Sequence, residues 1–489
     1  MGIRAHQRVV AVTLTDQDQR QGKQAAGTGA VFIAANDGML HAFDATNGEE
    51  MWAYVPRVTM KKLPALASTT YSTNHQYTTD GSPEVADVKV TVGTTKQWRT
   101  VLVAGLNAGG RGYYALDITD TNSPPKQLWE FCADATVCSR SDPDLGLTFG
   151  NPQFGTLADG RWVVFLTSGY NNVPGTDGIT SGDGKGYLYI LDAYTGELIK
   201  KVGTGSGDTG TPSGLAKITA ISNDPSSDPR ATYVYGGDLL GQMWRFDLTA
   251  ASGAVAVIKM GDAGVAKPIT TRPDVTMCGV PTTTTIAGVT TSSVEGVRVV
   301  LYGTGRLLDV PDTSNTDVQS LYVLKDSGNP IANIRGSTMV QQTLSLIGSS
   351  SNTNSYGITN NPVDLTQRDG WFFDWSINRG ERMNLDPQIV SGVANVVTNM
   401  PTSSSSCSVG GSSNLYQFNV CNGQSVRNQP VGVTLSNTSA AVGYIVIRLP
   451  DGQQKIITTL ADGTKETDAG LEEVSAEAHR VGWRRVRGE

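Results

Sequence analysis

The sequence predicts an all-β protein, a β-propeller of about seven irregular blades with long loop insertions. Two observations predict this fold. A strand–turn–strand phrase recurs along the chain, and the composition is rich in glycine and poor in charged residues. One such phrase is too small to bury its own apolar faces, so successive copies are expected to stack on their neighbours.

The clearest copy of the phrase runs from Ala34 to Trp52. Asn36-Asp37-Gly38 predicts a tight turn, because Asp-Gly tolerates the positive φ angles of a two-residue hairpin. The segment 39–44 then alternates as a return strand, and Thr46-Asn47-Gly48 predicts a second turn. Strand, turn and strand form an antiparallel meander, which is the unit of a propeller blade.

Further copies follow at irregular distances, and they begin at Gly112, Gly184, Gly237 and, more faintly, Ser320 and Gly411. The unequal spacing predicts inserted loops, which in a propeller are where partners usually bind. Two stretches, 278–296 and 336–356, are rich in Thr, Ser and Asn, and we expect them to be surface insertions.

The composition excludes several classes of function. The chain has 489 residues with a net charge of −7, and its pI is near 5.3, whereas a nucleic-acid-binding protein would show a basic face. No apolar run approaches the roughly 18 residues of a transmembrane segment. The first residues, Met1 to His6, contain no apolar signal core. We therefore expect neither a nucleic-acid partner nor a transmembrane segment.

The chain is expected to have three parts: an entry segment 1–26, a propeller 27–430, and a C-terminal hairpin with a basic tail 431–489. The entry segment holds one candidate strand around Arg8 to Leu14. In the last part, apolar runs on both sides of Asp451-Gly452 predict a hairpin.

The five cysteines indicate an oxidising compartment. Cys132 and Cys138 bracket a short polar loop, and Cys407 and Cys421 bracket a hairpin-like stretch, so both spacings suit local disulfides. This pairing leaves Cys278 unmatched. The alternative is five free thiols in a reducing compartment. No pair has the C-x-x-C spacing of a zinc site.

Several phrases together resemble one family. They include Ala35 to Phe43, Trp98 to Val103, Gly109 to Asp117, Tyr235 to Leu248, Gly303-Thr304-Gly305-Arg306 and Gly380-Glu381-Arg382. In this order, over about residues 27–425, the sequence resembles the C-terminal domain of the PilC/PilY family, proteins associated with the tip of bacterial type IV pili.

The resemblance implies a quinoprotein-like propeller at the pilus tip or the outer surface. It implies roles in pilus biogenesis, twitching motility and adhesion to host or abiotic surfaces, with minor pilins or a tip complex as partners. Family chains are usually longer, with an exported N-terminal half. We therefore expect this sequence to be a C-terminal portion or a shortened relative, exported with a longer chain or by a signal not present here.

The resemblance also implies a calcium loop before the Gly-Gly-Asp-Leu strand. The matching positions are Asp224, Ser226, Asp228, the Arg230 carbonyl and Thr232. Calcium prefers six to eight oxygen ligands, and fewer carboxylates mean weaker binding. Two hydroxyls stand where the family has carboxylates, so a turn capped by Asp side chains is the alternative.

The phrase Ala42-x-Asp44-x-x-x-Gly48-x-x-x-Trp52 matches the tryptophan-docking phrase of quinoprotein propellers. It predicts an indole packed between blades, with its N–H bound to a backbone acceptor. We expect His41 to be a packed, hydrogen-bonded residue and Trp371 to Trp375 to be a core strand. No adjacent cysteine pair or dense acidic set supports a pyrroloquinoline quinone (PQQ) enzyme, so we expect neither PQQ nor catalysis.

The sequence therefore favours a protein that binds partners through loops at the rim of the propeller, with calcium as a modulator. The alternative of a different class is a quinoprotein-like scaffold for assembly in the periplasm or at the outer membrane, without a link to pili. A PQQ-dependent dehydrogenase is the least favoured reading.

Overall fold

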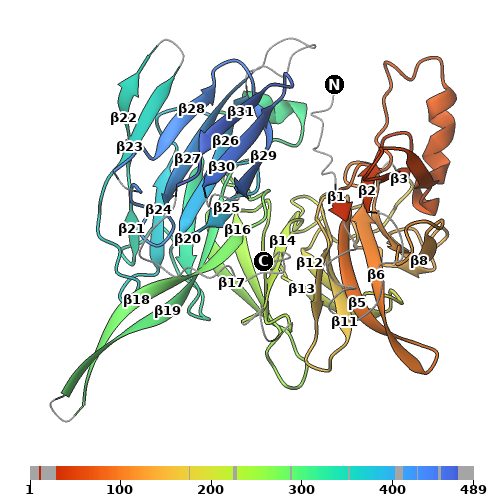
Figure 1. Ribbon diagram of the computed structural model, residues 1–489, viewed down its shortest axis with the longest axis horizontal. Coiled ribbons are helices and arrows are strands. Elements are labelled where there is room, and N and C mark those ends of the chain that lie inside the picture. Colours follow the sequence, from red (N-terminus) through yellow and green to blue (C-terminus); the bar gives the residue numbers. More distant parts are fainter. Residues whose placement is uncertain are drawn as a thin grey trace. The chain divides into compact units, whose positions relative to one another are not determined.

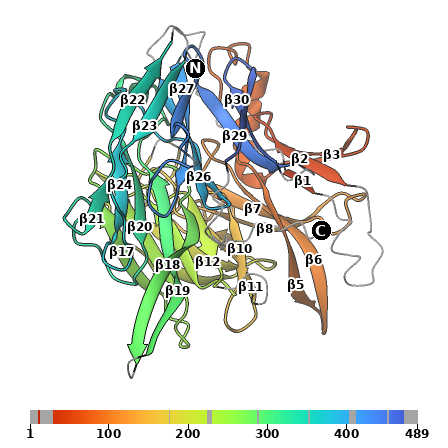
Figure 2. The same cartoon turned by 60° about the vertical axis from the view of Figure 1, so that its left-hand side comes forward.

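A computed structural model describes residues 10–12 and 29–471, except 176, 224–227, 229, 287–288, 351–352, 402–410, 427 and 450–452. Within these residues the chain forms seven sheets, mostly antiparallel meanders (Figures 1 and 2). The fold class is that of a seven-bladed β-propeller. The chain divides into two compact units. Of the described residues, the first unit includes those within 235–245 and 258–471, and the second includes those within 10–234 and 246–257.

In the second unit, the first sheet has the order β1-β2-β3-β4 (Val10–Val12, Ala30–Ala34, Leu40–Asp44, Glu50–Tyr54). The next contains β5-β6-β7-β8-β9 (Glu84–Val92, Thr95–Gly105, Gly112–Asp117, Lys126–Cys132, Arg140–Ser141). The third contains β10-β11-β12-β13 (Gln153–Thr156, Trp162–Thr167, Tyr187–Asp192, Leu198–Gly203).

The boundary between the units falls in the sheet β14-β15-β16-β17 (Ile218–Ile221, Tyr233–Gly237, Gln242–Asp247, Ala256–Asp262). In the first unit, a five-stranded sheet has the order β18-β19-β20-β24-β21 (Asp274–Ile286, Val289–Gly303, Ser320–Lys325, Gly370–Asp374, Met339–Gln341). The strands β18 and β19 extend beyond this sheet as a long ribbon (Figure 1).

The next sheet of the first unit has six strands, β22-β23-β28-β27-β26-β25 (Leu344–Ser349, Asn354–Ile358, Gly432–Ser436, Gly411–Asn419, Val393–Pro401, Gln388–Val390). The last is β29-β30-β31 (Ala441–Arg448, Gln454–Leu460, Lys465–Ala469). The predicted C-terminal hairpin is thus confirmed as β29 and β30, which pair antiparallel. The expected basic tail lies outside the described residues.

The aspartate that recurs at the end of the third strand in several of the sheets forms a turn. Asp44 Oδ1 accepts the amide of Thr46 at 2.7 Å, and Asp192 Oδ1 accepts the amides of Tyr194 at 3.0 Å and Thr195 at 2.8 Å. A carboxylate that binds the backbone two residues ahead stabilises a turn. The repeat in the sequence is therefore also a repeat of local hydrogen bonding.

Tryptophans connect consecutive sheets, as the phrase that ends in Trp52 predicted. The indole of Trp52 donates to Thr121 O at 3.3 Å, Trp129 to Ala193 O at 3.2 Å, and Trp371 to Val420 O at 2.9 Å. Each acceptor lies just beyond the third strand of a blade or its equivalent in the following sheet. The three bonds satisfy the one polar atom of a buried indole while its rings fill the space between sheets.

The aromatic strand β24 is core, as expected. Trp371, Phe373 and Trp375 are fully buried, and Phe373 contacts Trp375 edge to face with their centroids 5.3 Å apart. His41 is hydrogen-bonded, also as expected. Its ring nitrogens lie 2.9 Å from Asp37 Oδ2 and 2.8 Å from Glu50 Oε1.

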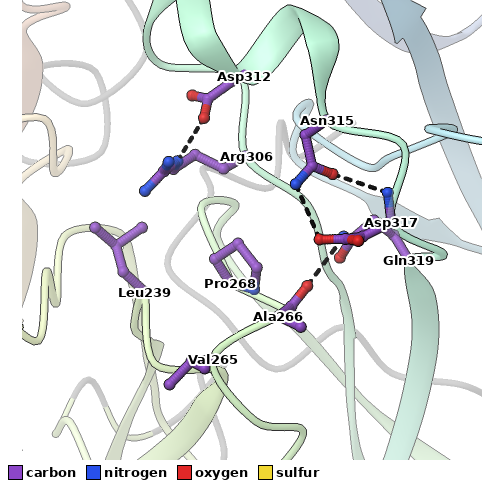
Figure 3. Close-up of a pocket in the computed structure, with 9 residues that line it drawn as sticks. All are labelled: Leu239, Val265, Ala266, Pro268, Arg306, Asp312, Asn315, Asp317 and Gln319. Carbon is purple, nitrogen blue, oxygen red and sulfur yellow. Dashed lines mark hydrogen bonds and ion pairs between the residues drawn. The ribbon is translucent and has the colours of Figure 1, made fainter.

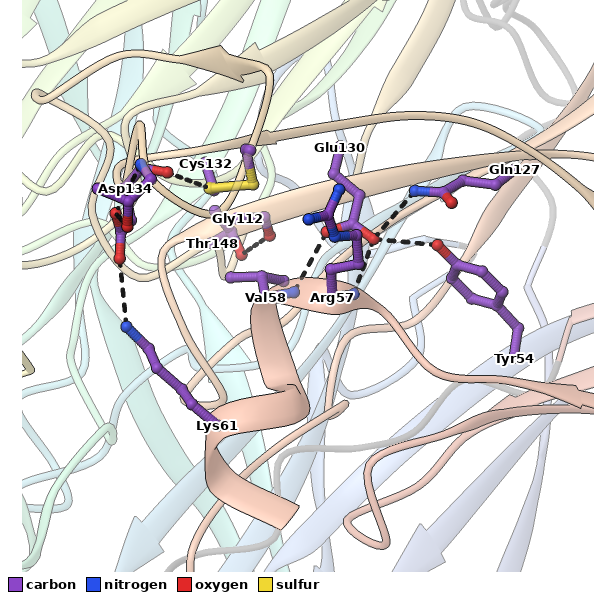
Figure 4. Close-up of a disulfide and its surroundings, with 12 residues drawn as sticks. Tyr54, Arg57, Val58, Lys61, Gly112, Gln127, Glu130, Cys132, Asp134 and Thr148 are labelled. Carbon is purple, nitrogen blue, oxygen red and sulfur yellow. Dashed lines mark hydrogen bonds and ion pairs between the residues drawn. A yellow bond between two sulfur atoms is a disulfide. The ribbon is translucent and has the colours of Figure 1, made fainter. Parts of the chain in front are cut away.

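A carboxylate from a neighbouring strand caps the 3-10 helix η1 (Arg57–Ala67) (Figure 4). Pro56 at its start offers no side-chain cap. Instead, Glu130 of β8 accepts the amides of Arg57 at 2.8 Å and Val58 at 3.2 Å, and also the Tyr54 hydroxyl at 3.0 Å. A buried carboxylate needs such donors, so Glu130 fixes η1 to the sheet β5–β9.

The disulfides confirm one expected pairing and correct the other. Cys132 bonds to Cys138, as predicted. Cys421 bonds to Cys278, 143 residues away, so its pairing with Cys407 was wrong and Cys278 is not unmatched. Cys407 lies outside the described residues. Closeness in the sequence does not decide the partner of Cys421, because the packing of the sheets brings Cys278 to it. Cys278 in β18 and Cys421 after β27 border one core between two sheets.

Candidate functional site

A small pocket of about 110 Å³ lies in the first unit, where two of the distinctive phrases meet. Leu239 comes from the turn between β15 and β16, and Arg306 follows β19. The other lining residues come from the loop after β17 and from the segment around the 3-10 helix η2 (Val310–Ser314), and they are Val265, Ala266, Pro268, Asp312, Asn315, Asp317 and Gln319.

The Gly-Gly-Asp-Leu phrase positions Leu239 through the backbone. The Asp238 carboxylate is buried, and it accepts the amides of Leu240 at 3.0 Å and Gln242 at 2.9 Å together with the Trp244 indole N–H at 2.9 Å. A carboxylate with three donors holds the turn in one conformation. Leu239 is the residue that this turn presents to the pocket.

Gly237 and Gly305 allow close approach of neighbouring segments. A Cβ on Gly237 would lie 2.2 Å from Ile269 Cγ2, and one on Gly305 would lie 2.3 Å from Arg382 Cβ. Gly305 also has a φ of +123°, a conformation that side chains other than glycine rarely adopt. These contacts explain why both phrases contain glycine next to the pocket.

One wall of the pocket is an ion pair between Arg306 and Asp312. Arg306 Nε lies 2.8 Å from Asp312 Oδ1, and the other carboxylate oxygen accepts the amides of Leu308 at 2.8 Å and Asp309 at 3.0 Å. Asp312 is buried, whereas the Arg306 side chain is 47% exposed. The pair therefore fixes the stem of Arg306 and leaves the end of its guanidinium at the pocket (Figure 3).

Arg382, from the Gly-Glu-Arg phrase, supports this wall from behind. Its buried guanidinium donates to carbonyls only, at 2.9 Å to Arg306 O, 2.6 Å to Asp312 O and 2.5 Å to Asn315 O. Burial lowers the pKa of Arg382, and the charge of Asp312 opposes this shift. By binding these three carbonyls, the Arg382 side chain holds η2 and the residues on both sides of it in place.

The neighbouring Glu381 points to a different cluster. Its buried carboxylate accepts from Thr398 Oγ1 at 2.6 Å and from Asn414 Nδ2 and Tyr416 OH, both at 2.9 Å. Burial raises the pKa of Glu381, and these hydrogen bonds oppose the shift. Adjacent acidic and basic residues of the phrase thus bind separate partners rather than each other.

The opposite wall holds three polar side chains (Figure 3). Asn315 Nδ2 donates to Asp317 Oδ2 at 2.9 Å, and Asn315 Oδ1 accepts the Asp317 amide at 3.0 Å. Gln319 Nε2 donates to Ala266 O at 3.1 Å. Gln319 is only 3% exposed, and its Oε1 has no hydrogen-bond partner among the described residues. This wall therefore offers a buried acceptor without a donor.

Comparisons with known proteins place this chain in a family. The sequence profile of the PilY1 beta-propeller domain matches residues 16–352, more than half of the chain. The chain belongs to the PilY1 family. A type IV pilus biogenesis factor PilY1 homolog of Xylella fastidiosa is 30% identical over 430 residues, covering 84% of this chain and 27% of that protein.

The type IV pilus biogenesis factor PilY1 of Pseudomonas aeruginosa is 31% identical over 434 residues, covering 79% of this chain and 34% of that protein. The crystal structure of the Pseudomonas aeruginosa PilY1 C-terminal domain has a TM-score of 0.65 and 26% identity, covering 91% of this chain and 93% of that one. The present chain thus spans about a third or less of the length of these curated relatives, and it shares the fold of the C-terminal domain.

In this PilY1-family chain, the expected calcium loop is described only in part. Asp224 and Ser226 lie outside the described residues. Arg230 binds the Asp228 carboxylate, with Nη2 2.5 Å and Nε 2.8 Å from Oδ2, and Thr232 Oγ1 donates to Ile221 O at 3.1 Å. The oxygen ligands that the structure describes here therefore fit a cation weakly, because a cation would have to displace the Arg230 guanidinium from the Asp228 carboxylate.

The described residues contain no group of three or more His, Cys, Asp or Glu side chains arranged to hold a metal ion. In the same part of the chain, no helix is both long enough and apolar enough to cross a bilayer. The sequence had identified the phrases around Leu239 and Arg306 but gave them no binding role, and it did not identify Gln319. Nothing in the local pattern marks Gln319, because its unpaired oxygen is a consequence of packing.

Proposed function

We propose that this chain acts in type IV pilus biogenesis as a binding protein, not as an enzyme. The carrying observation is its membership of the PilY1 family, with similarity to pilus biogenesis factors over most of its length. Minor pilins or a complex at the pilus tip are the proposed partners, and the pilus or cell surface is the proposed location. Adhesion to host or abiotic surfaces is a further part of this proposal.

A deletion strain tests the pilus role. Loss of the encoding gene is expected to reduce surface pili in sheared fractions and to reduce twitching, and the restored gene is expected to recover both. Normal piliation and twitching in the deletion strain would contradict the proposal. The tagged chain is also expected to co-purify with minor pilins. Retention by outer-membrane assembly machinery instead, without pilins, would support the scaffold alternative.

We also propose that calcium binds weakly at Asp224, Ser226, Asp228, the Arg230 carbonyl and Thr232. Oxygen-bearing side chains at 224, 226, 228 and 232, with a backbone carbonyl at 230, support this proposal. Calorimetry on chelator-treated protein is expected to show heat of binding at millimolar calcium. Arg230→Ala is expected to tighten binding, because the competing guanidinium is removed while the carbonyl ligand remains. No heat with either protein would reject the site.

A non-enzymatic role predicts no oxidation of alcohols. Reconstitution with PQQ and calcium is expected to produce neither quinone absorbance on the protein nor dye-linked alcohol oxidation. Either signal would show that the chain is an enzyme.

A further inference from the structure

We propose that the pocket between Arg306 and Gln319 binds an extended, uncharged segment of a partner protein. One peptide group of the segment would lie between Gln319 Oε1 and the Arg306 guanidinium, and an apolar side chain would rest on Leu239, Val265 and Pro268. This proposal deepens the binding role proposed above and rests on it.

The hydrogen-bonding groups of the pocket point to a peptide group. Gln319 Oε1 is a buried acceptor without a donor, and leaving such an atom unpaired costs free energy. The orientation of this amide is fixed, because its Nε2 donates to Ala266 O. Arg306 uses Nε for Asp312, so its terminal nitrogens remain as donors. A peptide group supplies the N–H and the C=O that these two residues lack.

The charges around the pocket favour an uncharged occupant. Arg306 is paired with Asp312. The Lys267 ammonium donates to Val318 O at 2.6 Å and lies 3.9 Å from Asp374 Oδ1, and the charge of Asp317 also acts on it. Asp374 is paired in turn with Arg335. Opposite charges therefore alternate around the pocket, so neither an acidic nor a basic side chain meets a field of one sign.

Apolar residues line part of the pocket beside the polar groups, and others follow or precede the lining residues in the sequence. Val265 lines the pocket and is 73% exposed. Leu308 and Val310, which flank the capping residue of η2, are also exposed, and so is Val318 between Asp317 and Gln319. Exposed apolar residues grouped around a few directed polar atoms are typical of a protein interaction site. The volume of about 110 Å³ limits the occupant to about one residue of an extended segment and excludes a large ligand.

The first experiment uses a small probe and the whole chain. N-acetyl-leucine-N′-methylamide carries one apolar side chain between two peptide groups. Ligand-observed saturation-transfer NMR is expected to detect its binding at millimolar concentration. N-acetyl-lysine-N′-methylamide and N-acetyl-aspartate-N′-methylamide are expected to bind at least about 5-fold more weakly. No transfer to the leucine probe, or stronger binding of a charged probe, would overturn the proposal.

Matched variants locate the probe. Val265→Asp is expected to abolish saturation transfer, and Gln319→Leu to weaken it at least about 5-fold. Val294→Asp is the control, because Val294 is also 73% exposed but lies on the β18–β19 ribbon. Retained binding in Val265→Asp, or equal loss in Val294→Asp, would overturn the proposal. Circular dichroism of each variant checks that a loss is not unfolding.

A second experiment separates this proposal from the proposed function. The soluble domains of the minor pilins of the same organism are titrated against the chain. Val265→Asp is expected to raise the Kd of a bound pilin at least about 10-fold, and Val294→Asp to leave it unchanged. If a pilin binds both variants equally, the pocket proposal fails while the binding role stands. If no pilin binds but the capped leucine does, the choice of partner fails while the pocket stands.

Discussion

At the scale of single residues, glycines at one position of the repeat have different surroundings. Gly48, Gly196 and Gly423 have φ angles of +76°, +69° and +73°. A Cβ on Gly196 would lie 2.4 Å from Trp129 Cγ, and one on Gly423 would lie 2.7 Å from Trp371 Cε3, whereas a Cβ on Gly48 would meet nothing within 4 Å. Two of these glycines therefore serve both the turn and the docking of an indole.

This difference makes a prediction about stability. Gly48→Ala is expected to lower the free energy of unfolding by about 1 kcal/mol through backbone strain alone. Gly196→Ala is expected to cost about 1–3 kcal/mol more, because the methyl group overlaps the Trp129 ring. Urea denaturation followed by tryptophan fluorescence measures both. Equal losses in the two variants would show that the Trp129 indole can move aside without lowering the free energy of unfolding.

His41 predicts a dependence of stability on pH. Burial lowers the pKa of the ring, but the hydrogen bond to Glu50 and the charge of Asp37 outweigh it, so the pKa is raised above 6.5. The folded state thus favours the imidazolium. This stabilisation is complete below pH 6.5 and is lost as the pH rises through the folded-state pKa.

The substitution His41→Gln is therefore expected to destabilise the protein by about 0.5–1 kcal/mol at pH 5.5, because both partners are partly exposed and screened. The difference is expected to shrink at pH 9, where the ring is neutral. Urea denaturation at both pH values checks this, and a loss that grows with pH would contradict the assigned sign.

At the scale of elements, the two disulfides differ in the length of chain they close. Cys278–Cys421 spans 143 residues and joins the sheet of β18 to the segment after β27, whereas Cys132–Cys138 spans 6 residues next to β8. A crosslink that closes a longer loop removes more entropy from the unfolded chain. The long-range bond therefore has the larger predicted effect.

Replacement of Cys278 and Cys421 together by Ala is expected to lower the free energy of unfolding by about 5 kcal/mol on the chain-entropy model. The same replacement of Cys132 and Cys138 is expected to cost about 2 kcal/mol. Guanidinium denaturation without reductant compares the two variants. A larger loss from the local pair would contradict the pairing or the model.

Arg382 makes a prediction about the segment around η2. Arg382→Met keeps much of the side-chain volume but leaves the carbonyls of Arg306, Asp312 and Asn315 without this donor. Hydrogen exchange of amides between 306 and 315 is expected to become at least about 10-fold faster, since each lost partner costs about 1–3 kcal/mol. Arg335→Met, which removes a half-exposed ion pair with Asp374, is the control and should leave this segment unchanged.

At the scale of the whole molecule, the repeat was sufficient to predict the fold class. Each blade-like sheet contains local antiparallel pairs, and local pairs are specified by alternation and turn residues that lie close together in sequence. The phrase around Asp44, Gly48 and Trp52 predicted both the turn and the inter-sheet indole bond. The phrase could do so because its residues lie within a dozen positions of one another, and because the indole bonds to the sheet that comes next along the chain.

The stretch 336–356 shows the limit of this reasoning. Its Ser and Asn content predicted a surface insertion, yet it contributes β21 and β22 and the start of β23 to two sheets. The outer strand β22 is mostly exposed, which explains its polar composition. The composition of this stretch thus predicted its exposure correctly but did not predict its pairing as strands, because an edge strand needs few apolar residues.

The sequence by itself determined the all-β repeat, the turns, the docking tryptophans, the local disulfide and the acidic charge, since each depends on neighbouring residues or on totals. Only the tertiary structure decided that Cys421 bonds to Cys278, that Glu130 caps η1, that Arg382 binds carbonyls, and that Gln319 holds an unpaired oxygen at a pocket. These contacts join residues far apart in the chain, and their partners are chosen by how the sheets pack, which no local pattern records.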